Sequence, residues 1–442
     1  MQWGLERWWY KLAQVCRQWR YLILSSQVRL DLHLVCTYGT PVADMLENSP
    51  PLPLIINFLQ DDREITAEDE QGVLLALQHR VRVRRVGFRI PASNLRKLIV
   101  TMDDEFPNLE RLFIWDQDDR SLILPQTFRA PNLHRLILWG TALPIESPIL
   151  MSTAGLVTLV LHDIPPSAYF HPGYLLTRLS IMLQLETLVV RFKSPLPDRD
   201  VVRQLLRTPI TTHLTLPNLR RFIFKGVNAY LEGLLAHLTT PLLSILEIVL
   251  FTRLTYTVTN LVEFMRTSEN LNFRALRLNL TTGSIIMTAK RRPGGGGCPF
   301  RMLIGNKHLD WQVASAVQIF NGFQPLLSSV EKLILGYEEH DSSEEGHNAV
   351  DRTHWRELVR PFEVVKTLHV ENELFGKIAD SLQSDDGEPA LDLLPNLEIL
   401  GYSGQGEANE AFAPFMNERR ERGRPVRLIM VSDLMASRRP RP

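Results

Sequence analysis

Two segments of this chain, FPNLERLFIWD (residues 106–116) and APNLHRLILWG (residues 130–140), repeat one pattern at a spacing of 24 residues. Each segment reads Pro-Asn-Leu, two polar residues and then alternating apolar positions. Alternation is the period of a β-strand that has one buried face. Self-similarity at a spacing between about 20 and 50 residues is the signature of a repeat array, in which each unit is covered by its neighbours.

The same strand pattern recurs along most of the chain. Its first apolar positions are Val83, Leu109, Leu133, Leu156, Leu185, Leu219, Leu243, Phe273, Val330, Val365 and Leu397. Most intervals leave room for a helix between strands, and the longest one follows Phe273. We therefore predict an α/β leucine-rich-repeat solenoid with a curved parallel sheet inside and helices outside. In the Pro-Asn-Leu turns, Pro should fix the approach to the strand and Asn should hydrogen-bond to its own backbone.

The charge balance and the cysteine content of the chain limit the kinds of partner and the cellular compartment that can be expected. The 442 residues carry 49 basic and 49 acidic side chains, so the formal net charge is zero, and nothing favours nucleic acid or a membrane surface as partner. Cys16, Cys36 and Cys298 are too few and too scattered for a disulfide framework or a zinc site, which predicts a cytoplasmic or nuclear protein. The first residues lack the apolar region of a secretory signal, and no apolar run is long enough to span a membrane.

Residues 5–24 are predicted to form a single helix. Trp8, Leu12, Val15, Trp19 and Leu22 follow steps of three and four residues, so they share one apolar stripe. In one interpretation this helix caps the open end of the solenoid, which would otherwise expose an apolar face to water.

A second interpretation comes from the amino-acid sequence of residues 8–26, WWYKLAQVCRQWRYLILSS, which resembles the second half of an F-box. The resemblance is carried by Leu12, Ala13, Val15, Cys16, Trp19, Arg20 and Leu22. It implies a small helical unit whose Leu12, Val15, Cys16, Trp19 and Leu22 bind the adaptor subunit of a cullin–RING ubiquitin ligase. Residues 36–41 and the repeats around them resemble the F-box-like repeat families that are expanded in mushroom-forming fungi.

These patterns give a domain plan. Residues 1–27 form a partial F-box-like helix or cap, residues 28–432 form an irregular solenoid, and residues 433–442 form a disordered basic tail. Flexible loops are expected near residues 289–299, which include four consecutive glycines, and near residues 338–351, which are acidic. Strands are expected at 28–35, 52–59, 300–304 and 426–431, and helices at 66–80, 198–208, 310–323 and 409–420.

Three motifs suggest chemistry, and each lacks a necessary part. The glycine-rich loop has no Lys-Ser/Thr to complete a phosphate loop. His340, His347 and His354 are seven residues apart in a polar loop and share no metal-binding geometry. The stretch GYSGQG (residues 401–406) fails the G-x-S-x-G pattern of a nucleophile elbow. We therefore predict a protein that is not an enzyme and uses no cofactor or metal.

The positive prediction concerns the strand residues that face away from the leucines. They should line the concave face as a partner-binding surface made of Phe113, Trp115, Ile137, Trp139, His162, Arg191 and Lys225. Arg277, Asn279, His369 and Glu371 should occupy equivalent positions in later repeats. Trp and Arg are frequent anchors of protein interfaces. The alternative is that neighbouring loops cover these side chains as part of the packed interior.

The F-box resemblance implies a non-catalytic, substrate-recognition subunit of a Skp–cullin–F-box ubiquitin ligase, which binds the adaptor and an unknown target protein. One alternative is a leucine-rich-repeat scaffold without any ubiquitin link. Another is a hydrolase in the irregular region after Thr281, which requires His, Asp and Ser side chains to meet in a deep pocket.

Overall fold

The computed structural model describes residues 8–26, 30–59, 63–116, 122–195, 209–251, 255–291, 298–337, 350–371, 374–383, 393–403 and 408–430. The chain forms two compact units. The N-terminal unit contains residues 1–199 and 211–219, and the C-terminal unit contains residues 200–210 and 220–442. The expected helix at 198–208, the histidines at 340 and 347 and the basic tail lie outside the described residues.

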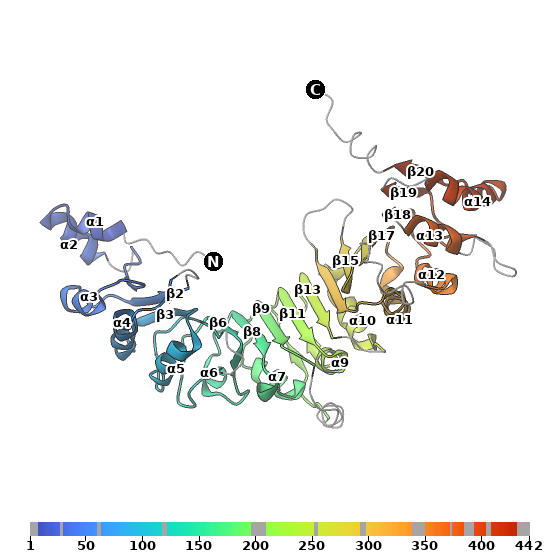
Figure 1. Cartoon of the computed structure of the whole chain (residues 1–442). Coiled ribbons are helices and arrows are strands. Elements are labelled where there is room, and N and C mark those ends of the chain that lie inside the picture. The colour runs from blue at the N-terminus through green and yellow to red at the C-terminus, as the bar shows by residue number, and fades with distance from the viewer. Residues whose placement is uncertain are drawn as a thin grey trace. The chain divides into compact units, whose positions relative to one another are not determined.

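The N-terminal unit is built on parallel strands that pair in chain order. They are β1 (Leu34–Cys36), β2 (Leu54–Phe58), β3 (Val83–Phe88), β4 (Arg111–Trp115), β6 (Arg135–Trp139), β8 (Thr158–Ile164) and β9 (Thr187–Phe192). Short strands β5 (Leu122–Ile123) and β7 (Thr141–Ala142) form a separate pair. The helices are α1 (Trp8–Ala13), α2 (Arg17–Ser25), α3 (Val42–Asn48), α4 (Ala67–Gln78), α5 (Ala92–Val100), α6 (Pro148–Ser152), η1 (Pro166–Ala168) and α7 (Pro172–Leu179). Helices α3 to α7 lie on one face of this sheet, and we call the other the open face (Figure 1).

Alternation in the sequence decides which side chains face the helices. In β4, Leu112 and Ile114 are almost fully buried, while Arg111, Phe113 and Trp115 are partly exposed on the open face. The repeated turn ahead of each strand closes on itself: the amide of Leu109 donates to the carbonyl of Phe106 (3.2 Å), and that of Leu133 donates to Ala130 (3.1 Å). The first leucine of each motif is therefore both a turn residue and a core residue.

The asparagines of the Pro-Asn-Leu turns do not bond to their own backbone, so that prediction was wrong. Their side-chain amides instead donate to a carbonyl of the preceding repeat. The four bonds are Asn108 to Val81 (2.7 Å), Asn132 to Pro107 (2.7 Å), Asn218 to Leu183 (3.1 Å) and Asn396 to Glu363 (2.9 Å). The physical reason is proximity, because parallel strands bring the same turn of adjacent repeats side by side. We call these four bonds the asparagine ladder.

The C-terminal unit departs from the expected all-parallel sheet. The strands of its large sheet are β11 (Arg221–Gly226), β13 (Ile245–Leu250), β14 (Ala275–Leu280), β15 (Ser284–Lys290), β16 (Phe300–Gly305), β17 (Lys332–Tyr337), β18 (Thr367–Glu371), β19 (Ile399–Ser403) and β20 (Arg427–Met430). In space their order is β11-β13-β16-β15-β14-β17-β18-β19-β20, and β15 is antiparallel to both of its neighbours. The prediction of a purely parallel sheet was wrong here, because a tight reversal after Leu280 turns the chain back as a hairpin before a helix can form.

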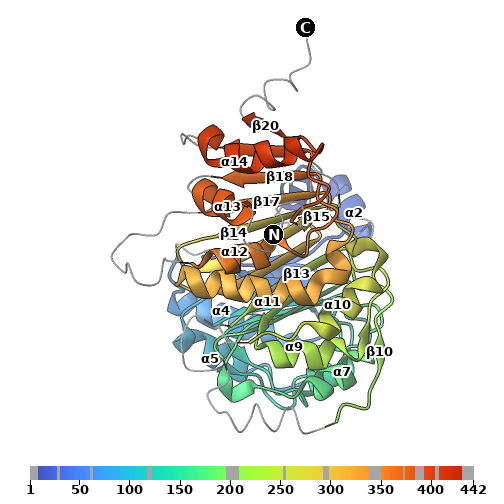
Figure 2. The same ribbon diagram turned by 90° about the vertical axis from the view of Figure 1, so that its right-hand side faces the viewer.

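Helices again cover one face of the C-terminal unit, as Figure 2 shows for α11, α13 and α14. They are α9 (Asn228–Leu235), α10 (Thr259–Arg266), η2 (Glu269–Leu271), α11 (Leu309–Leu327), α12 (Arg352–Val359), α13 (Leu374–Leu382) and α14 (Ala408–Glu421). The expected helices at 66–80, 310–323 and 409–420 correspond to α4, α11 and α14. The strand expected at 28–35 begins only at Leu34, because residues 30–31 form a turn in which Asp31 has a φ of 46°.

The fold is therefore α/β, with mostly parallel strands and helices on one face. Within the described residues, no helix combines the length and the apolar character that crossing a membrane requires.

Candidate partner-binding surfaces

Residues 5–24 were expected to form one helix, and that prediction was wrong. The chain leaves α1 after Ala13 and re-enters a helix at Arg17. Cys16 caps α2 with an extended backbone, and its sulfur accepts a hydrogen bond from the amide of Trp19 (3.4 Å). The Nε of Arg20 donates to the carbonyl of Ala13 (3.0 Å), which ties the two short helices together.

The break also changes which side chains are buried. Trp9, Ala13 and Ile23 are buried, and the indole nitrogen of Trp9 donates to the carbonyl of His33 (3.2 Å). The expected stripe does not pack as a cap: Val15, Trp19 and Leu22 are 62%, 47% and 55% exposed. Leu12 is half-buried and Cys16 is exposed. Val15 lies in the turn before α2, and Trp19 and Leu22 lie on α2; we call these three side chains the α2 apolar face.

The open face of the N-terminal unit carries a column of stacked side chains. Trp115, Trp139 and His162 are in register on β4, β6 and β8. The Trp115 and Trp139 rings stack at 4.6 Å and 13°, and Trp139 and His162 stack at 3.5 Å and 24°. The guanidinium of Arg89 lies 3.8 Å above the Trp115 ring, so Trp115 is covered on both ring faces.

Polar contacts fix the end of this column that is formed by Trp139 and His162. Arg191 Nη1 lies 3.1 Å from His162 Nε2 and donates to it. Trp139 Nε1 donates to a carboxylate oxygen of Asp163 (2.9 Å), which also lies 3.2 Å from His162 Nδ1. Asp163 has a φ of 52°, a left-handed conformation that Asp tolerates better than most residues. We call Arg89, Trp115, Trp139, His162 and Arg191 the stacked column.

A second row on the open face is positively charged. Arg85, Arg111 and Arg135 are in register on β3, β4 and β6, and all three are half-buried. None of them forms an ion pair among the described residues. The nearby acids are directed elsewhere: Glu110 accepts from Arg84 Nε (2.7 Å), and Asp31 also pairs with Arg84. We call Arg85, Arg111 and Arg135 the arginine row.

Apolar side chains separate these two rows. Phe113 is half-buried and Ile137 is 5% exposed, so Ile137 offers a partner little surface. Lys225 belongs to the C-terminal unit, where its ammonium lies 5.8 Å from the centre of the Phe251 ring. The N-terminal unit thus brings together Phe113, Trp115, Ile137, Trp139, His162 and Arg191 from the predicted surface.

Arg89, the arginine row and Asp163 were not among the residues predicted from the sequence. Arg111 and Arg135 occupy the same position of the two opening segments, two residues before Phe113 and Ile137, so the repeat alignment contained the signal. Arg89 follows the end of β3 and depends on the exit path of the chain, which the strand pattern does not specify.

In the C-terminal unit, His369, Glu371 and Ser403 lie close together on β18 and β19. His369 Nε2 is 3.3 Å from Ser403 Oγ and 4.0 Å from Glu371 Oε1. A serine–histidine–acid relay requires the acid on the other ring nitrogen, Nδ1, so this geometry does not form one. Glu371 is instead engaged by Arg277, whose Nη2 donates to its Oε1 (2.7 Å).

Burial lowers the pKa of His369, and the positive charges of Lys332 and Arg277 act in the same direction against the opposing effect of Glu371. The imidazole is therefore neutral at neutral pH. It is a buried packing residue with one polar contact to Ser403.

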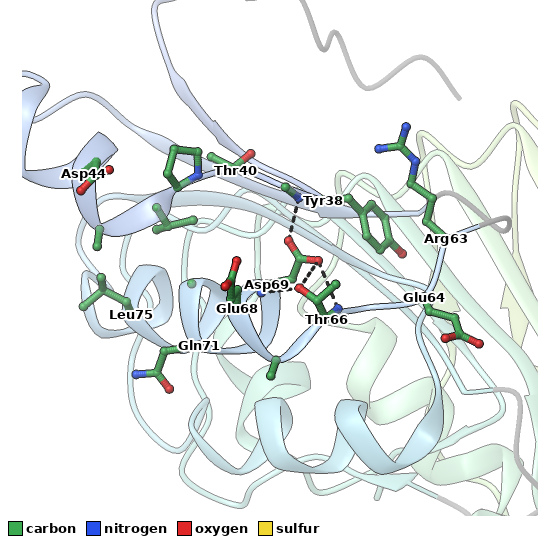
Figure 3. A pocket seen from close by; sticks show the side chains of 16 residues that line it. Tyr38, Thr40, Asp44, Arg63, Glu64, Thr66, Glu68, Asp69, Gln71 and Leu75 are labelled. Atoms are coloured by element: carbon green, nitrogen blue, oxygen red, sulfur yellow. Dashed lines mark hydrogen bonds between the residues drawn. The ribbon is translucent and has the colours of Figure 1, made fainter.

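A surface pocket of about 960 Å³ lies between the loop before α3 and the start of α4 (Figure 3). At its wall, Asp69 accepts hydrogen bonds from the Gly39 amide (2.7 Å) and the Thr66 amide (3.1 Å) and forms a capping box with Thr66. The one buried carboxylate of this wall is thus occupied by the backbone. Asp44, Glu64 and Glu68 of the lining lie near solvent, and the Thr66 hydroxyl, which donates to Asp69 (2.9 Å), is held in the capping box.

The remaining motifs also give no chemical site. His354 lies in α12, and residues 401–403 of the GYSGQG stretch are part of β19. In the part of the chain that the structure describes, no three His, Cys, Asp or Glu side chains are arranged to hold a metal ion.

Comparison with known proteins gives no relative: no family model matches the chain, and no curated protein matches it.

Proposed function

We propose that this chain is a non-catalytic protein-binding protein with a leucine-rich-repeat type of solenoid, and that it acts as a substrate-recognition subunit of a cullin–RING ubiquitin ligase. In this proposal the α2 apolar face binds the ligase adaptor, and the open face of the N-terminal unit binds the target. The protein performs no bond chemistry; it holds a target near the transferring enzyme.

The observation that carries the adaptor role is the exposure of Val15, Trp19 and Leu22. These are three of the seven residues that carry the resemblance of the N-terminal segment to an F-box. Packed against the sheet they would serve as a cap, but an apolar face left in solvent is typical of a surface that binds a partner. The target role is supported by the stacked column, because aromatic and arginine side chains on a rigid sheet are common interface anchors.

The test is binding of the full chain to a purified Skp-type adaptor subunit. We expect Trp19→Glu and Leu22→Glu each to weaken binding at least about tenfold, which corresponds to about 1.4 kcal/mol. Val100→Glu is the matched control, because Val100 is 68% exposed on α5, away from this face. If the wild-type protein shows no adaptor binding, the ligase proposal is wrong.

A scaffold with no ubiquitin role is the second candidate, and the stacked column favours it equally. It uses the same open face, but the α2 apolar face has no ligase partner. The scaffold therefore predicts no adaptor binding by the wild type and no effect of Trp19→Glu on target binding, whereas Trp115→Ala weakens target binding.

A further inference from the structure

The arginine row is an unusual feature of the open face because none of its three guanidiniums forms an ion pair among the described residues. Arg85, Arg111 and Arg135 face each other on adjacent parallel strands, which are ~4.8 Å apart. Like charges that are directly opposite each other destabilise a sheet. The acids that could compensate, Asp31 and Glu110, are both engaged by Arg84.

Burial adds to the destabilisation caused by the like charges of the arginine row. The Nε of Arg85 is buried and has no hydrogen-bond partner within the described residues. Desolvation lowers the pKa of Arg85, the neighbouring charges of Arg111 and Arg84 lower it further, and the charges of Asp31 and Glu110 oppose this shift without reversing it. A guanidinium remains charged under such conditions, so the row is a fixed set of positive charges with unused donors.

We infer that the open face of the N-terminal unit binds an extended, acidic segment of a partner protein, whose Asp and Glu side chains pair with Arg85, Arg111 and Arg135. Charge complementarity identifies the occupant. Apolar side chains of the same segment would contact Phe113 and the edges of Trp115 and Trp139. This inference rests on the proposed target-binding role and specifies the chemistry of the target.

The stacked column argues against nucleic acid as the occupant. Arginines beside tryptophans could bind a single strand if bases stacked on the indole rings. Here Trp115 lies between Arg89 and Trp139, and Trp139 lies between Trp115 and His162. Both faces of both rings are occupied, and only ring edges remain for a ligand. Ring edges suit a peptide better than a base.

The hydrogen-bond donors on this face also favour a peptide over nucleic acid as the occupant. Trp139 Nε1 is bonded to Asp163, but Trp115 Nε1 forms no hydrogen bond to any described residue. A half-buried indole N–H beside a row of guanidiniums can donate to a peptide carbonyl while the arginines hold the side chains.

The experiment selects peptides from a random phage-displayed library on the purified full-length chain. Three proteins are compared: wild type, the row variant Arg85→Gln/Arg111→Gln/Arg135→Gln, and a control variant Arg129→Gln/Arg220→Gln/Lys307→Gln. The control removes the same charge from exposed positions that form no ion pair among the described residues. We expect Asp and Glu to be enriched on the wild type and the control but not on the row variant.

A selected peptide, labelled with fluorescein, then gives dissociation constants by anisotropy. We expect Kd to rise at least about tenfold in the row variant, to stay within about twofold in the control, and to rise with salt. The melting temperature of the row variant should not fall below that of the wild type, because the substitution removes like-charge repulsion. This measurement shows that lost binding does not reflect lost folding.

Several outcomes would overturn the inference, and they separate it from the proposed function. If selected peptides are neutral or basic but their binding is lost in Trp115→Ala, the open face binds proteins and only the acidic specificity is wrong. If the wild type selects no peptide, both the inference and the target-binding role of this face fail. Tighter binding of labelled oligouridine than of any peptide, dependent on the arginine row, would assign the face to nucleic acid instead.

Discussion

At the scale of single residues, Trp139 is the centre of the N-terminal open face. It stacks on Trp115 and on His162, and its indole nitrogen donates to Asp163. Trp115 has one fewer of these contacts, because its outer face meets only the guanidinium of Arg89. The two tryptophans occupy the same position in consecutive repeats, yet they do not contribute equally to stability.

We therefore predict that Trp139→Ala lowers the free energy of unfolding by about 2–3 kcal/mol and Trp115→Ala by about 1–2 kcal/mol. Replacing a fully buried tryptophan by alanine costs about 3–5 kcal/mol, and we expect smaller values here because both side chains are only half-buried. Both values can be measured by urea unfolding of the N-terminal unit, with the circular dichroism of the tryptophan side chains as the signal. Trp311→Ala, at a 47% exposed site on α11, is the control. A larger effect for Trp115 than for Trp139 would contradict the assignment of contacts.

His369 gives a pH prediction. Its pKa is lower in the folded chain than its usual value near 6.5, chiefly because of burial. The unfolded chain therefore binds more protons as the pH falls, so this residue's contribution to stability is complete above pH ~6.5 and decreases at lower pH. We expect the melting temperature to decrease between about pH 7.5 and pH 5.5, and His369→Gln to reduce that decrease.

The matched control for His369 is His134→Gln, because His134 is exposed. This substitution should leave the pH dependence of the melting temperature unchanged. An equal decrease in wild type and His369→Gln would show that other groups control the acid sensitivity.

Trp115, Trp139, His162 and Arg191 of the stacked column could be predicted because strand parity and register determine them once the repeat is aligned. Arg89 and Asp163 could not, since their positions depend on chain paths beyond the strand ends. Ile137 was expected on the partner surface, but its side chain is only 5% exposed. Periodicity predicts the face of a strand but not how much solvent reaches it.

At the scale of elements, the asparagine ladder joins the turns of adjacent repeats. Each side chain donates to a carbonyl that lies 25 to 35 positions earlier in the chain. The bonds are exposed, so each should contribute about 0.5–1 kcal/mol.

We predict that Asn132→Asp destabilises the N-terminal unit by at least about 1 kcal/mol, because a carboxylate cannot donate to the Pro107 carbonyl and repels it. Asn132→Ala should cost about half as much. Thermal unfolding measures both, and Asn409→Asp at the start of α14 is the control, where an acid favours the helix. Equal stability of wild type and Asn132→Asp would show that the ladder contributes nothing.

The helix expected over residues 5–24 shows the limit of periodicity at this scale. Steps of three and four residues continue through Gln14 and Val15, so the sequence gives no obvious break. The break arises from local competition: the Cys16 sulfur caps a new helix, and Arg20 reaches back to Ala13. Two short helices then expose side chains that one long helix would bury.

At the scale of the whole molecule, the repeat predicted an α/β chain with parallel strands and helices on one face, and the structure confirms that coarser description. The order of strands could not be predicted where the repeat spacing fails, between Phe273 and Val330. Both β15 and β16 alternate as strands do, and alternation is the same for parallel and antiparallel neighbours. The direction of β15 is set by a short reversal that the repeat pattern does not contain.

That reversal has a consequence for how the chain is made. In the N-terminal unit each new strand of the large sheet can pair with the strand of that sheet synthesised before it. After Leu250 this rule fails, because the next neighbour of β13 is β16, which begins at Phe300. At a synthesis rate of roughly 5–20 residues per second, the edge of β13 waits for seconds on the ribosome without its partner. An unpaired strand edge is where foreign strands add. While the hairpin is being translated, the open edge of β13 is therefore a site that chaperones would need to protect.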